Sequence, residues 1–174
     1  MFVEPEKNLQ QFNLSPGQQV ADLGAGSGFY TLAAAKLVGG AGRVFAVEIQ
    51  KDMLSRLKNL AAAEHLSNVE VIWGDVERLG GTNLKDNSVD RAIVSNLLFQ
   101  AENRAALVEE VKRILKPGGK SMVIDWSDSS GLIGSGLKLV PKDETVKLFE
   151  VAGFSQEKEI NAGDHHYGLI FKKE

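Results

Sequence analysis

The chain has 174 residues, enough for one domain with its own hydrophobic core, and its formal net charge is −3. This charge gives no basis for general attraction to nucleic-acid phosphates, so we do not expect nucleic acid as a partner. The sequence contains no cysteine, which excludes disulfides, a thiolate nucleophile and thiolate metal ligands, and its three histidines lack metal-ligand spacing, so we expect no metal site.

The sequence has no apolar stretch near the roughly 20 residues that a membrane-spanning helix needs. Its N-terminus also lacks the apolar core of a signal peptide, so we expect a cytoplasmic protein. Because repeats, low-complexity tracts and linkers are absent, the sequence predicts a single domain over residues 1–174.

Strand-like and helix-like segments alternate through most of the chain. In chain order, the sequence predicts a strand over 18–24, a helix over 29–38, a strand over 42–49, a helix over 51–66, strands over 69–75 and 89–96, a helix over 103–116 and a strand over 120–126. Pro117, Gly118 and Gly119 are expected to end the last of these helices. This alternation is typical of a parallel sheet covered by helices.

The pattern changes after residue 126. A Gly/Ser-rich loop covers 127–136, and a helix is predicted over 142–154. Two extended segments, 155–161 and 165–173, predict a hairpin. The expected fold class is therefore α/β: a Rossmann-like doubly wound sheet of seven strands, five parallel plus a C-terminal antiparallel hairpin. We expect the loop over 127–141 to be mobile and to cover a substrate.

The first strand leads into a glycine-rich turn, Asp22-Leu-Gly-Ala-Gly-Ser-Gly28. In a doubly wound sheet, ligands bind at the carboxyl ends of the strands, where this turn is expected to lie. Glycine lets a ligand approach the backbone, and the helix that follows directs free N–H groups toward a phosphate or a carboxylate. A tight turn without a ligand is the alternative interpretation.

Acidic residues mark the expected ends of three successive strands: Asp22, Glu48 and Asp75. A carboxylate beside the turn would repel a pyrophosphate and attract an ammonium or sulfonium group. Glu48 could accept hydrogen bonds from both hydroxyls of a ribose, and Asp75 could accept one from the amino group of an adenine. These positions favour an adenosine ligand with a positive centre and no phosphates. A solvated charge at Glu48 and a turn residue at Asp75 are the alternatives.

Six motifs in order resemble a class I S-adenosylmethionine-dependent methyltransferase, over almost the whole chain. They are DLGAGSG (22–28), VFAVEIQ (44–50), VIWGDVERL (71–79), NSVDRAIVSN (87–96), LKPGGKSMVIDW (115–126) and AGF (152–154). The chain is most similar to the small type 11 branch, which includes the ubiquinone and menaquinone biosynthesis C-methyltransferases. It is shorter than the quinone enzymes at its N-terminus and before the hairpin, where they usually build a substrate lid. The absence of cysteine argues against the arsenite-methylating relatives.

The resemblance implies that the cofactor is S-adenosylmethionine, with its methionine part on the glycine turn, its ribose on Glu48 and its adenine capped by Asp75. The expected cofactor-binding residues lie at the ends of the first four strands: Asp22, Gly24, Ala25, Gly26, Gly28, Tyr30, Glu48, Ile49, Gly74, Asp75, Val76 and Asn96. A general base is needed only if the methyl acceptor must lose a proton, and the candidates are Asn96, Asp125, His165 and His166. For the two histidines, a solvated turn is the competing interpretation.

These features predict transfer of a methyl group to a small-molecule acceptor, for example a quinone-like ring or a lipid, by in-line displacement. An NAD-dependent oxidoreductase is one alternative, although the third glycine comes one residue early for the dinucleotide motif. A non-catalytic nucleoside-binding module is another. The short lid predicts an acceptor pocket that is open or is completed by a second copy of the chain in a homodimer.

Overall fold

The computed structural model describes residues 4–127 and 138–174. Its elements, in chain order, are α1 (Pro5–Phe12), β1 (Gln19–Leu23), α2 (Phe29–Val38), β2 (Arg43–Glu48), α3 (Lys51–Ala63), β3 (Val69–Trp73), β4 (Val89–Ser95), α4 (Arg104–Ile114), β5 (Leu115–Trp126), α5 (Lys142–Val151), β6 (Phe154–Ile160) and β7 (His166–Lys173).

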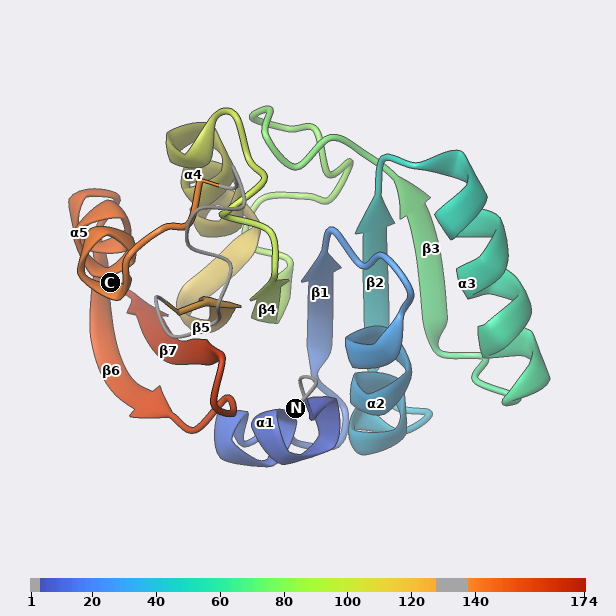
Figure 1. The fold of residues 1–174 in the computed structure, drawn as a ribbon. Coiled ribbons are helices and arrows are strands. Elements are labelled where there is room, and N and C mark those ends of the chain that lie inside the picture. Colours follow the sequence, from blue (N-terminus) through green and yellow to red (C-terminus); the bar gives the residue numbers. More distant parts are fainter. Residues whose placement is uncertain (1–3, 128–137) are drawn as a thin grey trace.

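The strands form one seven-stranded sheet in the order β3-β2-β1-β4-β5-β7-β6 (Figure 1). Strands β1 to β5 pair in parallel, and β7 lies antiparallel between β5 and β6. The expected fold class is confirmed, including the hairpin of β6 and β7. The strand order reverses between β1 and β4, so the carboxyl ends of these two strands flank the point where such sheets bind ligands.

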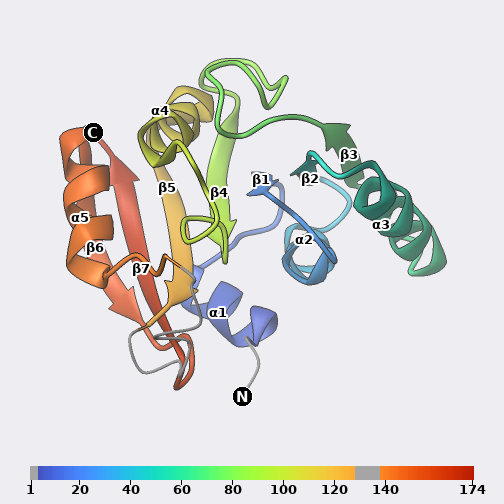
Figure 2. The same ribbon diagram turned by 45° about the horizontal axis from the view of Figure 1, so that its top comes forward.

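Helices cover both faces of the sheet, with α1, α2 and α3 on one face and α4 and α5 on the other (Figure 2). The central strands β1, β2 and β4 are mostly apolar because helices cover both of their faces, whereas the edge strand β6 is largely polar and exposed. In β1, for example, Val20 packs with the residues of α1 and α2, whereas its neighbours Ala21 and Leu23 pack in the cluster that includes α4 and α5. Alternate side chains of one strand therefore supply two separate cores.

The predicted boundary between α4 and β5 is wrong. The chain turns extended at Leu115, which pairs with Val89 of β4, and strand β5 then continues through Pro117 and both glycines to Trp126. Proline is tolerated in this stretch because the pairing with β4 is irregular between Val89 and Arg91. The helix therefore ends two residues before the predicted boundary, and the segment expected to form its terminating turn belongs to the strand.

Helix α1 was not anticipated by the sequence patterns. It begins at Pro5, where proline is favoured because the first helical N–H groups have no partner within the helix, and it ends at Asn13 in the left-handed conformation. Its buried residues Asn8, Leu9 and Phe12 face the sheet and α2. Two predicted helices also end early, at Ala63 and Val151. Most of the loop expected to cover the substrate, 128–137, lies outside the described residues.

Within 4–127 and 138–174, the helices are all too short or too polar to cross a bilayer. The same ranges contain no cluster of three or more histidine, aspartate or glutamate side chains arranged to hold a metal ion.

Candidate functional site

The glycine turn forms an open cradle between β1 and α2. The N–H groups of Gly24 and Ala25 donate to the carbonyl of Val47, at 2.9 and 3.0 Å, which ties the turn to the end of β2. Gly28 has φ = +80°, and a Cβ there would lie 2.1 Å from Cδ1 of Leu57, so only glycine fits. A Cβ on Gly26 would meet only the carbonyl oxygen of Gly24, at 3.8 Å. The surface of Gly26 is therefore free for a ligand.

Asp22 lies beneath this cradle and is 3% exposed. Its carboxylate accepts a hydrogen bond of 2.6 Å from the hydroxyl of Thr31 in α2. Burial raises the pKa of Asp22 to about 6, more than the hydrogen bond from Thr31 lowers it. A cation in the adjoining cavity would favour the ionised form of this carboxyl group.

Glu48, at the end of β2, points to the turn. Its Oε2 accepts from the N–H of Gly26 at 2.9 Å, and its Oε1 accepts from the N–H groups of Ile49 and Gln50, each at 2.9 Å. The side chain is therefore held by three backbone donors beside the surface that Gly26 leaves open. A fixed carboxylate in this position is well suited to accept ribose hydroxyls.

Asp75 lies in the loop after β3. Its carboxylate accepts from the N–H of Glu77 at 3.0 Å, and its own N–H donates to Gly81 at 3.0 Å. The loop is anchored by Glu110 of α4, which accepts from the N–H groups of Gly80 and Thr82. This anchor was not foreseen, because nothing in the sequence pattern connects Glu110 with a loop that precedes it by about 30 positions.

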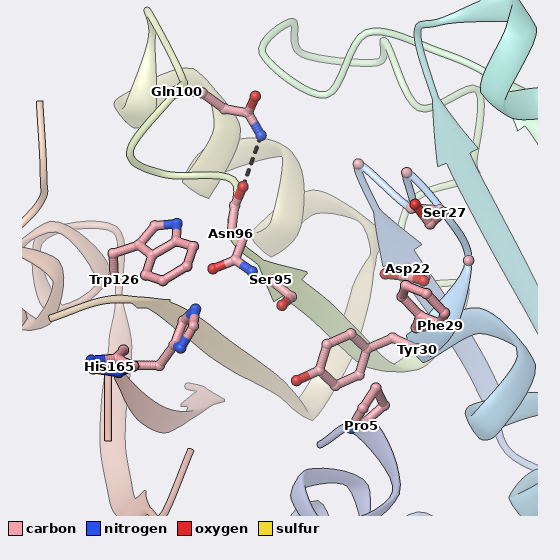
Figure 3. Close-up of a pocket in the computed structure, with 15 residues that line it drawn as sticks. Pro5, Asp22, Ser27, Phe29, Tyr30, Ser95, Asn96, Gln100, Trp126 and His165 are labelled. Carbon is pink, nitrogen blue, oxygen red and sulfur yellow. Dashed lines mark hydrogen bonds between the residues drawn. The ribbon is translucent and has the colours of Figure 1, made fainter. Parts of the chain in front are cut away.

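A cavity of about 830 Å³ opens beside the cradle. Its lining brings together nine of the residues predicted from the sequence: Asp22, Gly24, Ala25, Gly26, Gly28, Tyr30, Asn96, His165 and His166. Six others are outside its described lining, and their roles stay predictions: Glu48, Ile49, Gly74, Asp75, Val76 and Asp125. Figure 3 shows Tyr30, Asn96 and Trp126 projecting into the same space from α2, the end of β4 and the end of β5.

Some lining residues were missed by the sequence reasoning. Pro5 reaches the cavity because α1 packs against α2, and that helix was not predicted. Ser27, Phe29 and Ser95 belong to segments that were correctly placed, so their position beside the glycines and Asn96 was the available signal. Gln100, by contrast, follows β4 where candidate residues were expected, and it also lines the cavity; its side-chain amide donates to the carbonyl of Asn96 at 2.8 Å (Figure 3).

Tyr30 closes one side of the cavity. Its hydroxyl accepts a hydrogen bond of 2.8 Å from Asn8 of α1, which fixes the ring. Burial raises the pKa of Tyr30 to about 12, so the phenol remains protonated at neutral pH. Tyr30 thus lines the cavity as a fixed, uncharged side chain and is not a base at neutral pH.

Asp125 and His166 are both buried. The carboxylate of Asp125 is buried and accepts from the N–H groups of Leu98, Phe99 and Trp126, which holds the turn after β4. His166 is not in a solvated turn: it begins β7, is 8% exposed and packs against Trp126, with ring centroids 4.1 Å apart and the ring planes tilted by 32°. The interpretation of His166 as a solvated residue is wrong. Strand β7 lies between β5 and β6 in the sheet, so His166 is paired with Trp126 of β5 rather than exposed in a turn.

Comparisons with known proteins identify relatives of the whole fold. A family model described as a methyltransferase domain matches residues 14–165. The chain is similar to the ubiquinone/menaquinone biosynthesis C-methyltransferase UbiE of Hydrogenovibrio crunogenus, with 35% identity over 120 residues that cover 68% of this chain and 46% of that protein. It is 31% identical over 112 residues to an arsenite methyltransferase of Halobacterium salinarum, covering 64% of this chain and 28% of that protein.

The chain therefore spans less than half the length of either of these two curated relatives. Among solved structures, a SAM dependent methyltransferase from Aquifex aeolicus has a TM-score of 0.87 and 27% identity, covering 98% of this chain and 90% of that one. The likeness thus extends over nearly the full length of both chains.

Proposed function

The chain belongs to the class I S-adenosylmethionine-dependent methyltransferases, and we propose that it transfers a methyl group from this cofactor to a small-molecule acceptor. The observation that carries the proposal is the arrangement at the edge of β1 and β2. There, Glu48 is hydrogen-bonded to Gly26 of the open cradle, and Asp22 lies buried below it. A negative site next to an unhindered backbone suits a cationic nucleoside better than a pyrophosphate.

The residues present fit the proposed cofactor in three respects. The surface of Gly26 is open to a ligand, as the space around its missing Cβ demonstrates. The carboxylate of Glu48 is fixed beside the glycine turn, which supports its proposed role in accepting hydrogen bonds from ribose hydroxyls. Asp22 has an elevated pKa of about 6 that a cation would lower. S-adenosylmethionine supplies, when bound, a methyl group already activated on a sulfonium centre.

The chain's own residues would then position the acceptor and exclude water. The cavity has room for both a cofactor and a small acceptor, since pockets of roughly 300–1,000 Å³ hold drug-sized ligands. The methyl group and its acceptor must lie in line, and such positioning can lower the barrier by several kcal/mol. Quinone-like rings, lipid head groups and small metabolites are the acceptor classes included in the proposal.

Two calorimetric titrations of the purified protein test the proposal. S-adenosylhomocysteine, the product form of the cofactor, is expected to bind with a micromolar or lower Kd, and NADH is expected to give no saturable heat. An acceptor screen that reports release of S-adenosylhomocysteine would then demonstrate turnover. Saturable NADH binding without any response to S-adenosylhomocysteine would overturn the proposal in favour of an oxidoreductase.

A further inference from the structure

The wall of the cavity opposite the glycine turn is built by three neighbouring strands. Asn96 follows β4, and its N–H donates to the carbonyl of Ile124 in β5 at 2.8 Å. Trp126 ends β5, and His166 is its register partner at the start of β7. The sheet therefore presents these three side chains in a row along one edge, and all three line the cavity. Figure 3 shows Asn96 beside Trp126, facing the same space as Tyr30.

Two buried polar atoms in this wall lack partners. Neither Oδ1 of Asn96 nor Nε2 of His166 has a hydrogen-bond partner among residues 4–127 and 138–174. Buried polar atoms are almost always paired in folded proteins, because leaving them unpaired forfeits the hydrogen bonds that water would provide. Since both atoms belong to residues that line one cavity, an occupant of that cavity is the natural partner for both.

The chemistry of the two atoms limits what the occupant can be. Oδ1 of Asn96 only accepts, so it requires a donor. Nε2 of a neutral histidine accepts in one tautomer and donates in the other. A hydroxyl group can meet either need, because it donates and accepts, and an amine also brings a donor. An ether or a carboxylate brings acceptors alone, so it leaves Oδ1 of Asn96, in the orientation of this structure, without a donor.

Charge adds a second restriction. Among the described residues that line the cavity, none is lysine or arginine, whereas Asp22 contributes a carboxyl group. A carboxylate or phosphate on the occupant would be desolvated there without a cationic partner. Burial also lowers the pKa of His166, with a smaller contribution from His165, which favours the neutral ring over a cation that could pair with an anion.

We propose that Asn96 and His166 form the methyl-acceptor subsite of this chain, and that they select an uncharged acceptor presenting a hydroxyl or amine donor. The inference rests on the proposed methyltransferase function and adds to it a chemical class of acceptor and the two residues that recognise that class. The same two atoms and the acidic lining of the cavity disfavour anionic acceptors and acceptors without a donor.

Binding of three small probes to protein saturated with S-adenosylhomocysteine tests this subsite. Catechol presents two hydroxyl donors, veratrole is the same ring with both hydroxyls methylated, and benzoate is an anionic counterpart. Binding is followed by the indole N–H signal of Trp126 in a ¹⁵N NMR spectrum. The chain has two tryptophans, so Trp73→Phe identifies the signal. Catechol is expected to bind at least ten times more tightly than either veratrole or benzoate.

His166→Phe separates recognition from packing, because it keeps an aromatic ring against Trp126 and removes Nε2. In this variant the preference for catechol over veratrole is expected to fall below threefold, while S-adenosylhomocysteine still binds. His65→Asn is the control, since it removes an imidazole that lies just beyond the end of α3. His65 has a left-handed backbone, which asparagine tolerates, so this variant should retain the full preference for catechol over veratrole.

Three results would overturn the inference: equal binding of catechol and veratrole by the unmodified protein, no detectable binding of catechol, or an undiminished preference in His166→Phe. The first two need no variant, so they decide the question even if His166→Phe does not fold. Failure of S-adenosylhomocysteine to bind at all would instead count against the proposed function.

Discussion

At the scale of single residues, Asp22 connects the cofactor site with pH. Burial raises the pKa of its carboxyl group to about 6, and no cation of the described chain forms an ion pair with it. In the free protein the group therefore holds its proton below pH 6. Because a bound ammonium or sulfonium group favours the carboxylate, that proton must leave when the cofactor binds below this pH.

The affinity for S-adenosylmethionine should consequently fall as the pH falls through 6. Titration calorimetry is expected to give a Kd that rises about tenfold between pH 7 and pH 5. In Asp22→Asn the affinity should be low and should no longer change over this range. Asparagine can still accept the hydrogen bond from Thr31, so the turn is expected to keep its geometry.

Asp125→Asn is the matched control. Burial also raises the pKa of Asp125 to about 6, but its carboxylate is occupied by the backbone N–H groups of Leu98, Phe99 and Trp126. This variant should retain the pH dependence of cofactor binding. If Asp22→Asn kept the pH dependence and Asp125→Asn lost it, Asp125 and not Asp22 would be the carboxyl group that loses its proton when the cofactor binds.

Glu48 should act through its two carboxylate oxygens. Glu48→Gln keeps the size of the side chain but replaces one accepting oxygen by an amide nitrogen that would face backbone N–H donors. The affinity for S-adenosylhomocysteine is expected to fall roughly ten- to a hundredfold, the scale of one or two charge-assisted hydrogen bonds. The control is calorimetry with Glu70→Gln. Glu70 is a half-exposed carboxylate of β3 that pairs with Arg43, so its loss should leave the affinity unchanged. An unchanged affinity in Glu48→Gln would remove Glu48 from the site.

Much at this scale was foreseeable, because a carboxylate directly after an apolar strand lies at a known edge of a parallel sheet. Asp22 and Glu48 were identified in this way, and both approach the glycine turn. The burial of His166 was not foreseeable. It depends on β7 inserting between β5 and β6, a pairing between segments about 40 residues apart that local patterns do not encode.

At the scale of elements, the loop after β3 depends on α4. Burial alone would raise the pKa of Glu110, but hydrogen bonds from Arg113, from Thr82 and from the N–H groups of Gly80 and Thr82 lower it to about 2. Glu110 is therefore ionised at neutral pH and joins α4 to the loop that carries Asp75. A helix on one face of the sheet thus positions a loop expected to meet the adenine.

Glu110→Gln should destabilise the protein and loosen this loop. Because it removes the charge that pairs with Arg113 inside a buried network, the free energy of unfolding is expected to fall by on the order of 3 kcal/mol in chemical denaturation. The affinity for S-adenosylhomocysteine should also fall, since Asp75 is no longer held. The neighbouring Glu109→Gln, at an exposed position of α4, should change neither quantity. Equal stability of the two variants would contradict the proposed anchor.

The elements themselves were largely predictable, since strands buried on both faces and amphipathic helices leave clear patterns. The errors came where tertiary contacts decide. Leu115 is extended because it pairs with Val89, although its apolar spacing fits the preceding helix. Helix α1 is short and polar on average, and packing of Leu9 and Phe12 in the core with α2 compensates for its weak pattern.

At the scale of the whole molecule, one half of the sheet carries the residues proposed to bind the cofactor, and the other half carries those proposed to bind the acceptor. Strands β1, β2 and β3 present the glycine turn and the carboxylates proposed for the cofactor. Strands β4, β5 and β7 present Asn96, Trp126 and His166 on the opposite wall. The reversal of strand order between β1 and β4 places Asp22 and the glycine turn opposite Asn96, Trp126 and His166 around one cavity, with Glu48 just beside it. Methyl transfer between two bound molecules needs such an arrangement.

The most direct measurement is a crystal structure of the protein with S-adenosylhomocysteine. The account predicts the ribose hydroxyls within hydrogen-bonding distance of the Glu48 carboxylate, the amino-acid end of the ligand at Asp22 and the glycine turn, and the sulfur facing Asn96 and His166 across the cavity. A ligand bound with its ribose away from Glu48, or outside this cavity altogether, would contradict it.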